Sequence, residues 1–385
     1  MSGWILEAIK GSSFKTKLSA MKKFFLEKSK VEDLTKCSLC PNMCRYACPV
    51  SIVDGKETTS PAGKARIAYL IKHGYIDLTT ENVLPLYYCL SCESCTPHCF
   101  FQFNLSELIR PIRVEAIMRG EYPKQLNNLF DNVMNFGCAF GEVEKREHET
   151  NNRGDILIFR GCVVRKFYPE LSKIATEVIE KLGYKSFVIE DEICCGYLLY
   201  EAGHDEYFMK IAKMNAERIN RSGAKILLTL SPECTYTYRI IYPRYKIKMK
   251  PRVMHITEFI KENMGKIRFS ERKERIVIHD PPKLTISLNK TRILLEILSE
   301  IPGLKVLRPM RNGKNTFYAG VNNLLYWIDK ELLLEINRER LRELEEESNI
   351  IVTASPSAKR GLEIAGGKVY DLVEYLRDTI EGVRD

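Results

Sequence analysis

The spacing of apolar and polar residues divides the chain into a helical front part and a longer part in which strands and helices alternate. In the front part, apolar side chains recur at helical spacing over residues 62–73 and again over residues 105–118. Ser60 and Pro61 stand where the first of these helices should begin, and Gly74 stands where it should end. The pattern therefore predicts a mainly helical front part.

Beyond residue 150 the pattern changes to short apolar runs and one long amphipathic stretch. Residues 155–159 and 186–189 are typical of buried strands, and residues 169–182 between them gather their apolar side chains on one helical face. A third apolar run, residues 226–230, predicts another strand. A strand, a helix and a second strand in this order form a βαβ unit, so this part predicts an open α/β sheet.

Two further segments combine basic and apolar residues. Residues 1–36 predict a basic amphipathic extension, which would suit an anionic membrane surface; packing on its own domain or on a partner subunit is the alternative. Its apolar face consists of Phe14, Leu18, Met21 and Phe25. Residues 239–252 alternate basic and apolar positions, which predicts an extended strand with one basic face. With the apolar run 324–328 it would form a surface for anionic lipid or a partner, unless it is a solvated edge.

The composition narrows the class of protein. The 385 residues suffice for two or three domains, and 45% hydrophobic residues exclude a disordered chain. No apolar run approaches the roughly 18 residues of a membrane-spanning helix, and no secretory signal is recognisable. The net charge of +9 is moderate and no nucleic-acid reading motif accompanies it, so nucleic acid is not an expected partner. We expect the chain in the cytoplasm, either free or attached peripherally to the cytoplasmic face of the membrane.

Thirteen cysteines indicate metal binding rather than disulfides. Cytoplasmic thiols stay reduced, and an odd number of cysteines fits a disulfide framework badly. Eight of them form two compact runs with two or three residues between neighbours. The first run is Cys37, Cys40, Cys44 and Cys48, and the second is Cys89, Cys92, Cys95 and Cys99.

Such runs predict two [4Fe–4S] clusters, because three thiolates of one run wrap one cubane while the fourth reaches the cubane held by the other run. We expect one cluster on Cys37, Cys40, Cys44 and Cys99. We expect the second on Cys89, Cys92, Cys95 and Cys48. Zinc is the alternative, although structural zinc sites take two separated cysteine pairs rather than compact runs of four.

Four more cysteines, Cys162, Cys194, Cys195 and Cys234, each follow a predicted strand. Ligands of open α/β sheets bind at the carboxyl ends of the strands, so these four thiols are expected to converge on a third metal site. Four cysteines alone do not choose between a cubane, a modified iron–sulfur cluster, zinc and metal-free thiols. Cys138 has no partner at ligand spacing and is expected to be an isolated buried thiol.

Two resemblances extend this interpretation. Residues 36–120 resemble the helical ferredoxin domain of heterodisulfide reductases and of succinate and fumarate dehydrogenases. Gly161-Cys162, Cys194-Cys195-Gly196 and the segment Ser231 to Cys234 resemble the CCG cysteine-rich domain, which binds an unusual iron–sulfur cluster and normally occurs in pairs. Ser231 stands where the family pattern has a fifth cysteine.

The resemblance implies a multidomain chain, in which an all-α helical ferredoxin with two [4Fe–4S] clusters precedes a pseudo-two-fold pair of α/β CCG domains. The expected boundaries are 1–36 for the extension, 37–120 for the ferredoxin, 121–152 for a linker, 153–265 for the first CCG domain and 266–385 for the second.

In the second copy the family's cysteine motifs are replaced throughout. The replacing segments are His279 to Pro282, Tyr318 to Gly320 and Ser355 to Ala358. Without soft ligands for iron, this copy is expected to be empty and structural.

The family resemblance implies an iron–sulfur electron-transfer subunit. It would pass electrons from an FAD-dependent dehydrogenase of glycerol 3-phosphate or a 2-hydroxy acid towards a quinone or another redox acceptor. The chain has no dinucleotide-binding glycine motif after a strand, so the flavin is expected on a partner. Whether the chain is itself an enzyme stays open. The alternative is a heterodisulfide-reductase-like subunit that reduces a disulfide at the Cys162 site.

Overall fold

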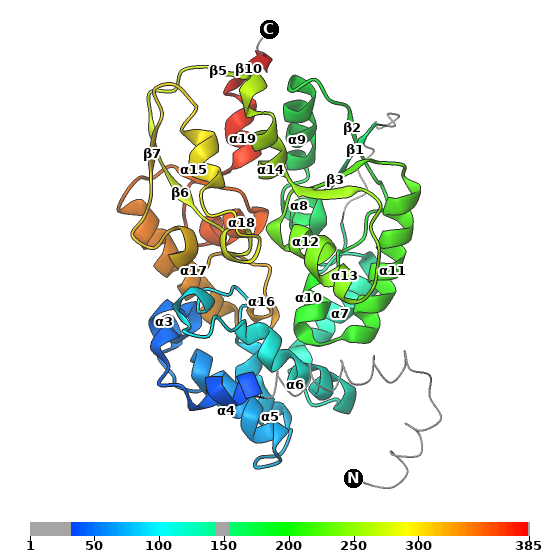
Figure 1. The fold of residues 1–385 in the computed structure, drawn as a ribbon, viewed down its shortest axis with the longest axis vertical. Helices are drawn as coiled ribbons and strands as arrows, with labels where there is room; N and C mark the ends of the chain where they lie inside the picture. Colours follow the sequence, from blue (N-terminus) through cyan, green and yellow to red (C-terminus); the bar gives the residue numbers. More distant parts are fainter. Residues whose placement is uncertain (1–31, 144–153, 384–385) are drawn as a thin grey trace.

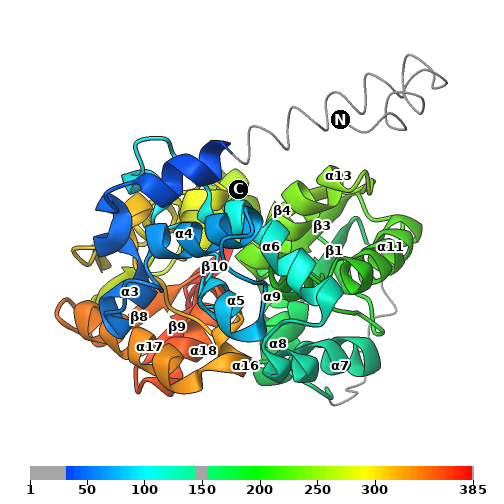
Figure 2. The same ribbon diagram turned by 90° about the horizontal axis from the view of Figure 1, so that it is seen from below.

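The computed structural model describes residues 32–143 and 154–383. Most of the extension predicted for residues 1–36 lies outside the described residues; residues 32–39 are helical. Figure 1 shows a helical front module below two α/β units that stand side by side. Figure 2, seen from below, shows the front helices lying across the underside of both units. No helix among the described residues has the length and apolar character needed to cross a bilayer.

The front module is built from helices, as the apolar pattern predicts. Its elements are η1 (Met43–Ala47), α3 (Pro49–Asp54), α4 (Pro61–Lys72), α5 (Thr80–Tyr87), η2 (Thr96–His98) and α6 (Leu105–Arg119). The Ser60 hydroxyl accepts a hydrogen bond from the Gly63 N–H and so caps α4, with Pro61 in the first turn. Gly120 ends α6 in the left-handed conformation.

The first α/β unit contains a four-stranded parallel sheet in the order β2-β1-β3-β4. Its strands are β1 (Ile156–Phe159), β2 (Ser186–Val188), β3 (Ile226–Thr229) and β4 (Arg252–His255). Its helices are α8 (Gly161–Phe167), α9 (Glu170–Lys181), α10 (Tyr197–Ala202), α11 (Asp205–Arg221), α12 (Pro232–Tyr236), η4 (Thr237–Ile241), α13 (Tyr242–Arg244) and α14 (Ile256–Glu262). The three predicted strands and the helix predicted for 169–182 are confirmed to within a residue or two at each end.

The second α/β unit repeats the strand order of the first, as β7-β6-β8-β9. Its strands are β6 (Arg275–His279), β7 (Lys305–Leu307), β8 (Ile351–Thr353) and β9 (Val369–Asp371). Its helices are η6 (Lys283–Ser287), α15 (Ile293–Leu298), η7 (Gly313–Asn315), α16 (Leu325–Ile328), α17 (Lys330–Glu345), α18 (Pro356–Ile364) and α19 (Leu372–Arg377). After η5 (Met264–Lys266), β5 (Ile267–Phe269) pairs antiparallel with β10 (Ile380–Val383) beside the two units.

The prediction of an extended basic strand over residues 239–252 is wrong. The segment continues the π-helical turn η4 into α13 and then a loop, and only Arg252 belongs to a strand. Tyr238, Ile241 and Tyr242 are buried at helical spacing, which holds the segment in a helix. Arg239 forms an ion pair with Glu258, so the expected basic face is partly neutralised within the chain.

The apolar run 324–328 is largely part of the interior and not the predicted contact surface. Leu324 and Leu325 are buried, and the rings of Tyr326 and Trp327 contact Phe140. The run gains its burial from a segment almost two hundred residues away, which the local apolar pattern does not reveal.

Residues 121–143, the described part of the expected linker, are folded into the first α/β unit. After η3 (Lys124–Leu126), α7 (Asn127–Phe136) buries Leu129, Phe130 and Val133. The Phe130 ring meets His204 edge to face. These described residues therefore contribute to the core, because their apolar face is buried against the first unit.

Candidate metal centres

The eight cysteines of the front module fall into two groups, each drawn from both runs. Burial first, and then the charges of Cys44, Cys99 and Cys40, raise the pKa of Cys37 to about 12. The pKa of Cys44 is also about 12, through burial and then Cys99 and Cys48. Cys99 of the second run thus lies within electrostatic range of the first run.

The second group surrounds a cavity. Cys48 of the first run lines it together with Cys89, Cys92 and Cys95, and the space not filled by protein atoms is about 380 Å³, part of it open to solvent. Burial raises the pKa of Cys92 to about 12 and that of Cys95 well above its ordinary value. A cavity with four thiols in its wall fits an iron–sulfur cluster, whose protein ligands are thiolates.

The backbone of both runs is tightly turned. Asn42 lies between cysteines of the first run and Ser91 and Glu93 between cysteines of the second, and all three have a positive φ. Non-glycine residues rarely adopt this conformation outside places where the surrounding structure fixes them. Asn42 is fixed by its side-chain bond to the Ser60 hydroxyl at 2.9 Å. The turns let several cysteines of one short segment face the same side.

The third group lies at the carboxyl ends of the first sheet, where the sequence predicts it. Cys162 begins α8 after β1, Cys194 and Cys195 precede α10, and Cys234 lies in α12 after β3. All four are buried and line one cavity with about 330 Å³ of unfilled space, again partly open. Asn322 of the second α/β unit also lines it.

The thiols of the third group act on one another's pKa in series. A hydrogen bond from the Cys162 thiol lowers the pKa of Cys194. A hydrogen bond to the Cys195 thiol and burial together raise this pKa by more, so it lies well above its ordinary value. The same balance, with Cys234 as the next neighbour, holds for Cys195. Such neighbours favour protonated thiols, and a bound cation would favour the thiolates.

Cys138 adjoins this group through Cys162, which corrects its interpretation as an isolated thiol. Its Sγ donates to the Cys162 carbonyl at 3.6 Å, and the Ala139 N–H donates to the Cys162 Sγ at 3.4 Å. The thiol is buried, as expected. No spacing motif marks it in the sequence, because α7 and the turn after it bring it to the site.

Among the residues that the structure describes, no three side chains of Cys, His, Asp or Glu are placed to surround a single metal ion.

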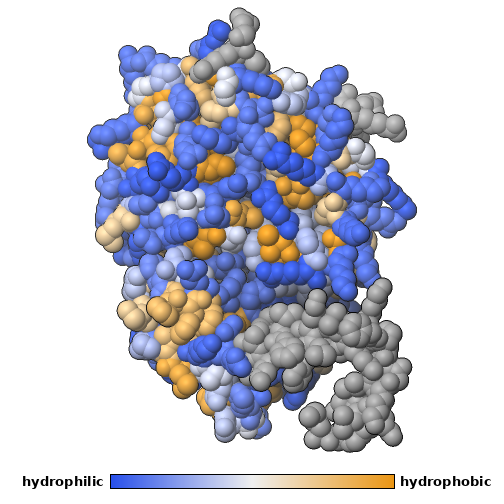
Figure 3. All heavy atoms as spheres, in the orientation of Figure 1, coloured by the Kyte–Doolittle hydropathy of each residue, from blue (hydrophilic) through white to orange (hydrophobic). Residues whose placement is uncertain are grey.

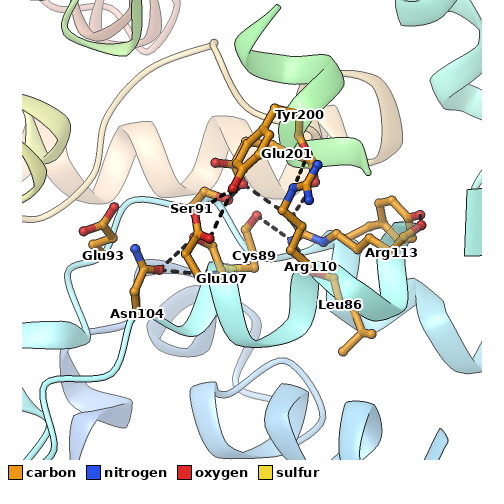
Figure 4. Close-up of polar contacts among 12 residues, drawn as sticks. Leu86, Cys89, Ser91, Glu93, Asn104, Glu107, Arg110, Arg113, Tyr200 and Glu201 are labelled. Carbon is orange, nitrogen blue, oxygen red and sulfur yellow. Dashed lines mark hydrogen bonds and ion pairs between the residues drawn. The ribbon is translucent and has the colours of Figure 1, made fainter. Parts of the chain in front are cut away.

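The second cysteine run is bound to the first α/β unit through α6 and α10, as Figure 4 shows. The fully buried Arg113 of α6 donates to the carbonyls of Leu86 at 2.6 Å, Cys89 at 3.3 Å and Glu201 at 2.8 Å. Its guanidinium lies 3.6 Å from the Glu201 carboxylate, which also accepts a hydrogen bond from Ser91. α10 therefore joins the Cys89–Ser91 loop to Cys195; its six residues span about 9 Å.

The second α/β unit contacts the same cysteine run. The buried ammonium of Lys283 lies 2.8 Å from the Glu93 carboxylate and 4.2 Å from the Tyr236 ring centre. Lys283 directly follows residues 279–282, the first of the three segments in which the sequence comparison within the chain predicts a replaced cysteine motif. At the third such segment the Ser357 hydroxyl accepts the N–H groups of Val321 and Asn322 at 3.0 and 2.8 Å. Protein hydrogen bonds thus occupy the polar groups there.

Comparisons with known proteins agree with the cysteine pattern. Residues 156–239 match the profile of the CCG family, a cysteine-rich domain. One of the subunits of the dihydromethanophenazine:CoB–CoM heterodisulfide reductase from Methanosarcina barkeri is 25% identical over 291 residues, which cover 71% of each chain. An uncharacterized iron–sulfur protein of Methanocaldococcus jannaschii is 24% identical and covers 59% of this chain and 47% of its own.

A bacterial relative and a solved structure complete the comparison. Lactate utilization protein A 2 of Bacillus cereus is 23% identical over 165 residues, which are 39% of this chain and 66% of that protein. The crystal structure of a hypothetical protein from Helicobacter pylori superposes with a TM-score of 0.57 and covers 94% of this chain and 75% of its own. At 13% identity this likeness concerns the fold alone.

Proposed function

Because this chain belongs to the CCG-domain iron–sulfur family, we propose that it is the electron-transfer subunit of a multi-subunit oxidoreductase. Cys37, Cys40, Cys44 and Cys99 hold one [4Fe–4S] cluster, and Cys48, Cys89, Cys92 and Cys95 hold the second. A third iron–sulfur cluster sits at the CCG site. The grouping of cysteines across the two runs carries this proposal, because each cubane needs a ligand from the other run.

The clusters, when bound, supply one-electron redox chemistry, and the chain's own residues set their spacing and surroundings. Arg113 and Ser91 fix the second cysteine run against α10, whose first residue follows Cys195 and Gly196 in the chain. Lys64, almost fully buried, lines the cavity of the second group and offers a positive charge to an anionic cluster. The bound groups would thus be held at short, fixed separations.

Electrons enter at the first group, where large apolar side chains are exposed. Leu39 is 79%, Met43 73% and Phe100 93% exposed, and each lies beside a cysteine of that group or within its run. Figure 3 shows apolar side chains gathered on the face of the front module. Apolar residues that cluster on a surface mark protein contacts, so this surface is the docking site of the donor protein.

For the donor we propose an FAD-dependent dehydrogenase of the glycerol 3-phosphate or 2-hydroxy-acid type, with a quinone or similar acceptor. The lactate utilization relatives favour a 2-hydroxy acid. The basic amphipathic segment 1–36, which lies almost wholly outside the described residues, holds the complex at the cytoplasmic face of the membrane. Deletion of residues 1–30 should release the protein from membranes, and unchanged retention would reject this role.

The test is anaerobic purification of the tagged chain from its native source, followed by addition of lactate, glycolate or glycerol 3-phosphate. A flavoprotein should co-purify, and one of the substrates should bleach the iron–sulfur absorbance. Phe100→Asp should weaken the flavoprotein's binding without changing the iron content. Met310→Asp, a change at an equally exposed residue of the second α/β unit, is the control and should bind normally.

The second candidate function is disulfide reduction at the third site, favoured by the similarity to the heterodisulfide reductase of Methanosarcina barkeri. Against it, no cysteine follows Cys234, so the second α/β unit offers no facing cluster. A preparation without flavoprotein that reduces a mixed disulfide, and loses this activity in Cys162→Ala, would replace the first proposal with this one.

A further inference from the structure

Cys138 belongs to none of the cysteine motifs, yet its thiol lies beside Cys162, one of the residues that line the third site. It follows α7 in the turn Phe136 to Phe140 and is fully buried. Its Sγ lies 3.6 Å from the Cys162 carbonyl oxygen, while the next residue's N–H binds the Cys162 Sγ at 3.4 Å. The series of neighbouring thiols therefore contains five members, Cys138, Cys162, Cys194, Cys195 and Cys234.

The turn that carries Cys138 is fastened to the site. The Gly137 carbonyl accepts the Cys194 N–H at 2.7 Å and the Arg165 guanidinium at 3.0 Å. Gly137 has φ +60°, and a Cβ there would lie 2.8 Å from Ile193 Cγ2, so the backbone can pass this closely only as glycine. Arg165 also adds a positive charge that favours the thiolates of Cys138 and Cys162.

Ser231, which stands at the place of the family's fifth cysteine, lines the same cavity, but its hydroxyl is already hydrogen-bonded within the chain. Its hydroxyl donates to the buried Glu233 carboxylate at 2.5 Å. A serine oxygen is also a harder ligand than a thiolate and suits iron–sulfur chemistry less well. The site thus lacks a thiolate at that place, while the thiol of Cys138 lies behind the lining residue Cys162.

We propose that Cys138 is the fifth thiolate ligand of the third site and replaces the ligand missing at Ser231. The inference rests on the proposed function in that the site binds an iron–sulfur group. On binding, the S–H bond of Cys138 is exchanged for an S–Fe bond and the proton leaves to solvent, with no change in electron count. Cys138 thereby gains a role that none of the cysteine motifs assigns to it.

The test compares three variants prepared anaerobically: Cys138→Ala, Ser231→Ala and Cys138→Ala with Ser231→Cys. Iron content and the electron paramagnetic resonance spectrum are the readouts. Cys138→Ala should weaken metal retention at the third site about tenfold or more, since even groups that only support ligands cost this much. Ser231→Ala should leave spectrum and iron unchanged, and the double variant should recover the third-site signal. An unchanged signal in Cys138→Ala, or an equal loss in Ser231→Ala, would overturn the proposal.

A measurement on the unaltered chain tests the proposal even if one of the variants does not fold. Cysteine alkylation is followed by mass spectrometry before and after iron is removed with a chelator. Cys138 should become reactive together with Cys162, whereas Cys138 reactivity that is independent of iron would contradict ligation. If the front module binds iron and the third-site signal is present, but Cys138→Ala does not change that signal, only this inference is refuted. Absence of iron from the whole chain refutes the proposed function with it.

Discussion

His255 and Asp371 show how one position of the fold constrains a side chain. They end β4 and β9 in the two α/β units, and each caps the following helix by accepting the N–H two residues on. Glu258 and Glu374 complete the two capping boxes. Burial lowers the pKa of His255 to about 4 and raises that of Asp371 to about 8. The position therefore favours an uncharged hydrogen-bonding group.

These shifts predict opposite pH dependences of stability. The unfolded chain binds a proton at His255 more readily than the folded chain. The contribution of His255 to the free energy of unfolding is therefore complete above pH 6.5. It is lost as the pH falls towards 4, by up to about 3 kcal/mol. Asp371 is held protonated when folded, so stability falls as the pH rises from 3.8 towards 8. Urea unfolding of His255→Gln should show a smaller loss between pH 7 and 5 than the unaltered chain.

The control for this prediction is His73→Gln, a change at an exposed histidine after α4. It should lose as much stability between pH 7 and 5 as the unaltered chain. An acid loss of the same size in His255→Gln would show that other groups cause it.

At the scale of elements, α6 and α10 are joined by a buried ion pair. Arg113 has no exposed surface and Glu201 almost none, so neither charge can turn to water when its partner is removed. Burial raises the pKa of Glu201, opposed by Lys283 and Arg113. Breaking such a pair leaves an uncompensated buried charge, which is more costly than the pair is favourable.

Arg113→Met should lower the free energy of unfolding by about 3–5 kcal/mol, measured by urea unfolding. Arg113→Met combined with Glu201→Gln should cost less than the two single changes together, because no unpaired charge remains. Arg119→Met on the exposed end of the same helix should cost less than about 0.5 kcal/mol. Additive single effects would argue against coupling between the two side chains.

The elements with a regular apolar period were predictable, and those held by distant contacts were not. Residues 62–73, 105–118 and 169–182 carry a complete apolar face, and their helices form where expected. Basic and apolar residues alternate over residues 239–252 as they would in a strand. The first residues of this segment are nevertheless helical, because Tyr238 and Tyr242 are buried in the first unit. The predicted ends of the strands were enough to place Cys162 and Cys234. The position of Cys138 beside Cys162 depends on how α7 packs, which the sequence pattern does not reveal.

At the scale of the whole molecule, the second α/β unit supports the cysteine runs although it has no cysteine itself. Lys283 pairs with Glu93 between Cys92 and Cys95, and the Ser94 hydroxyl donates to the Thr316 carbonyl at 3.1 Å. Tyr88 donates to the Asp329 carboxylate at 2.9 Å. The unit therefore holds the second run from one side while α10 holds it from the other.

Lys283→Met should destabilise the chain by about 3–5 kcal/mol, because Glu93 is left buried without its partner. The remaining negative charge beside Cys92 should also lower the reduction potential of the cluster proposed at the second group, which redox titration would measure. Lys305→Met, a change at an exposed lysine of the same unit, should alter neither quantity. An unchanged potential in Lys283→Met would show that this side chain does not act on the second cluster.

The most direct test of the account is the iron and acid-labile sulfide content of the anaerobically purified Cys162→Ala chain, with its electron paramagnetic resonance spectrum. This variant isolates the front module from the third site. We predict about eight irons and an equal amount of sulfide per chain, with the spectrum of two interacting reduced [4Fe–4S] clusters. Zinc in place of iron, or a colourless chain without either metal, would contradict the assignment of the eight cysteines and the electron-transfer function with it.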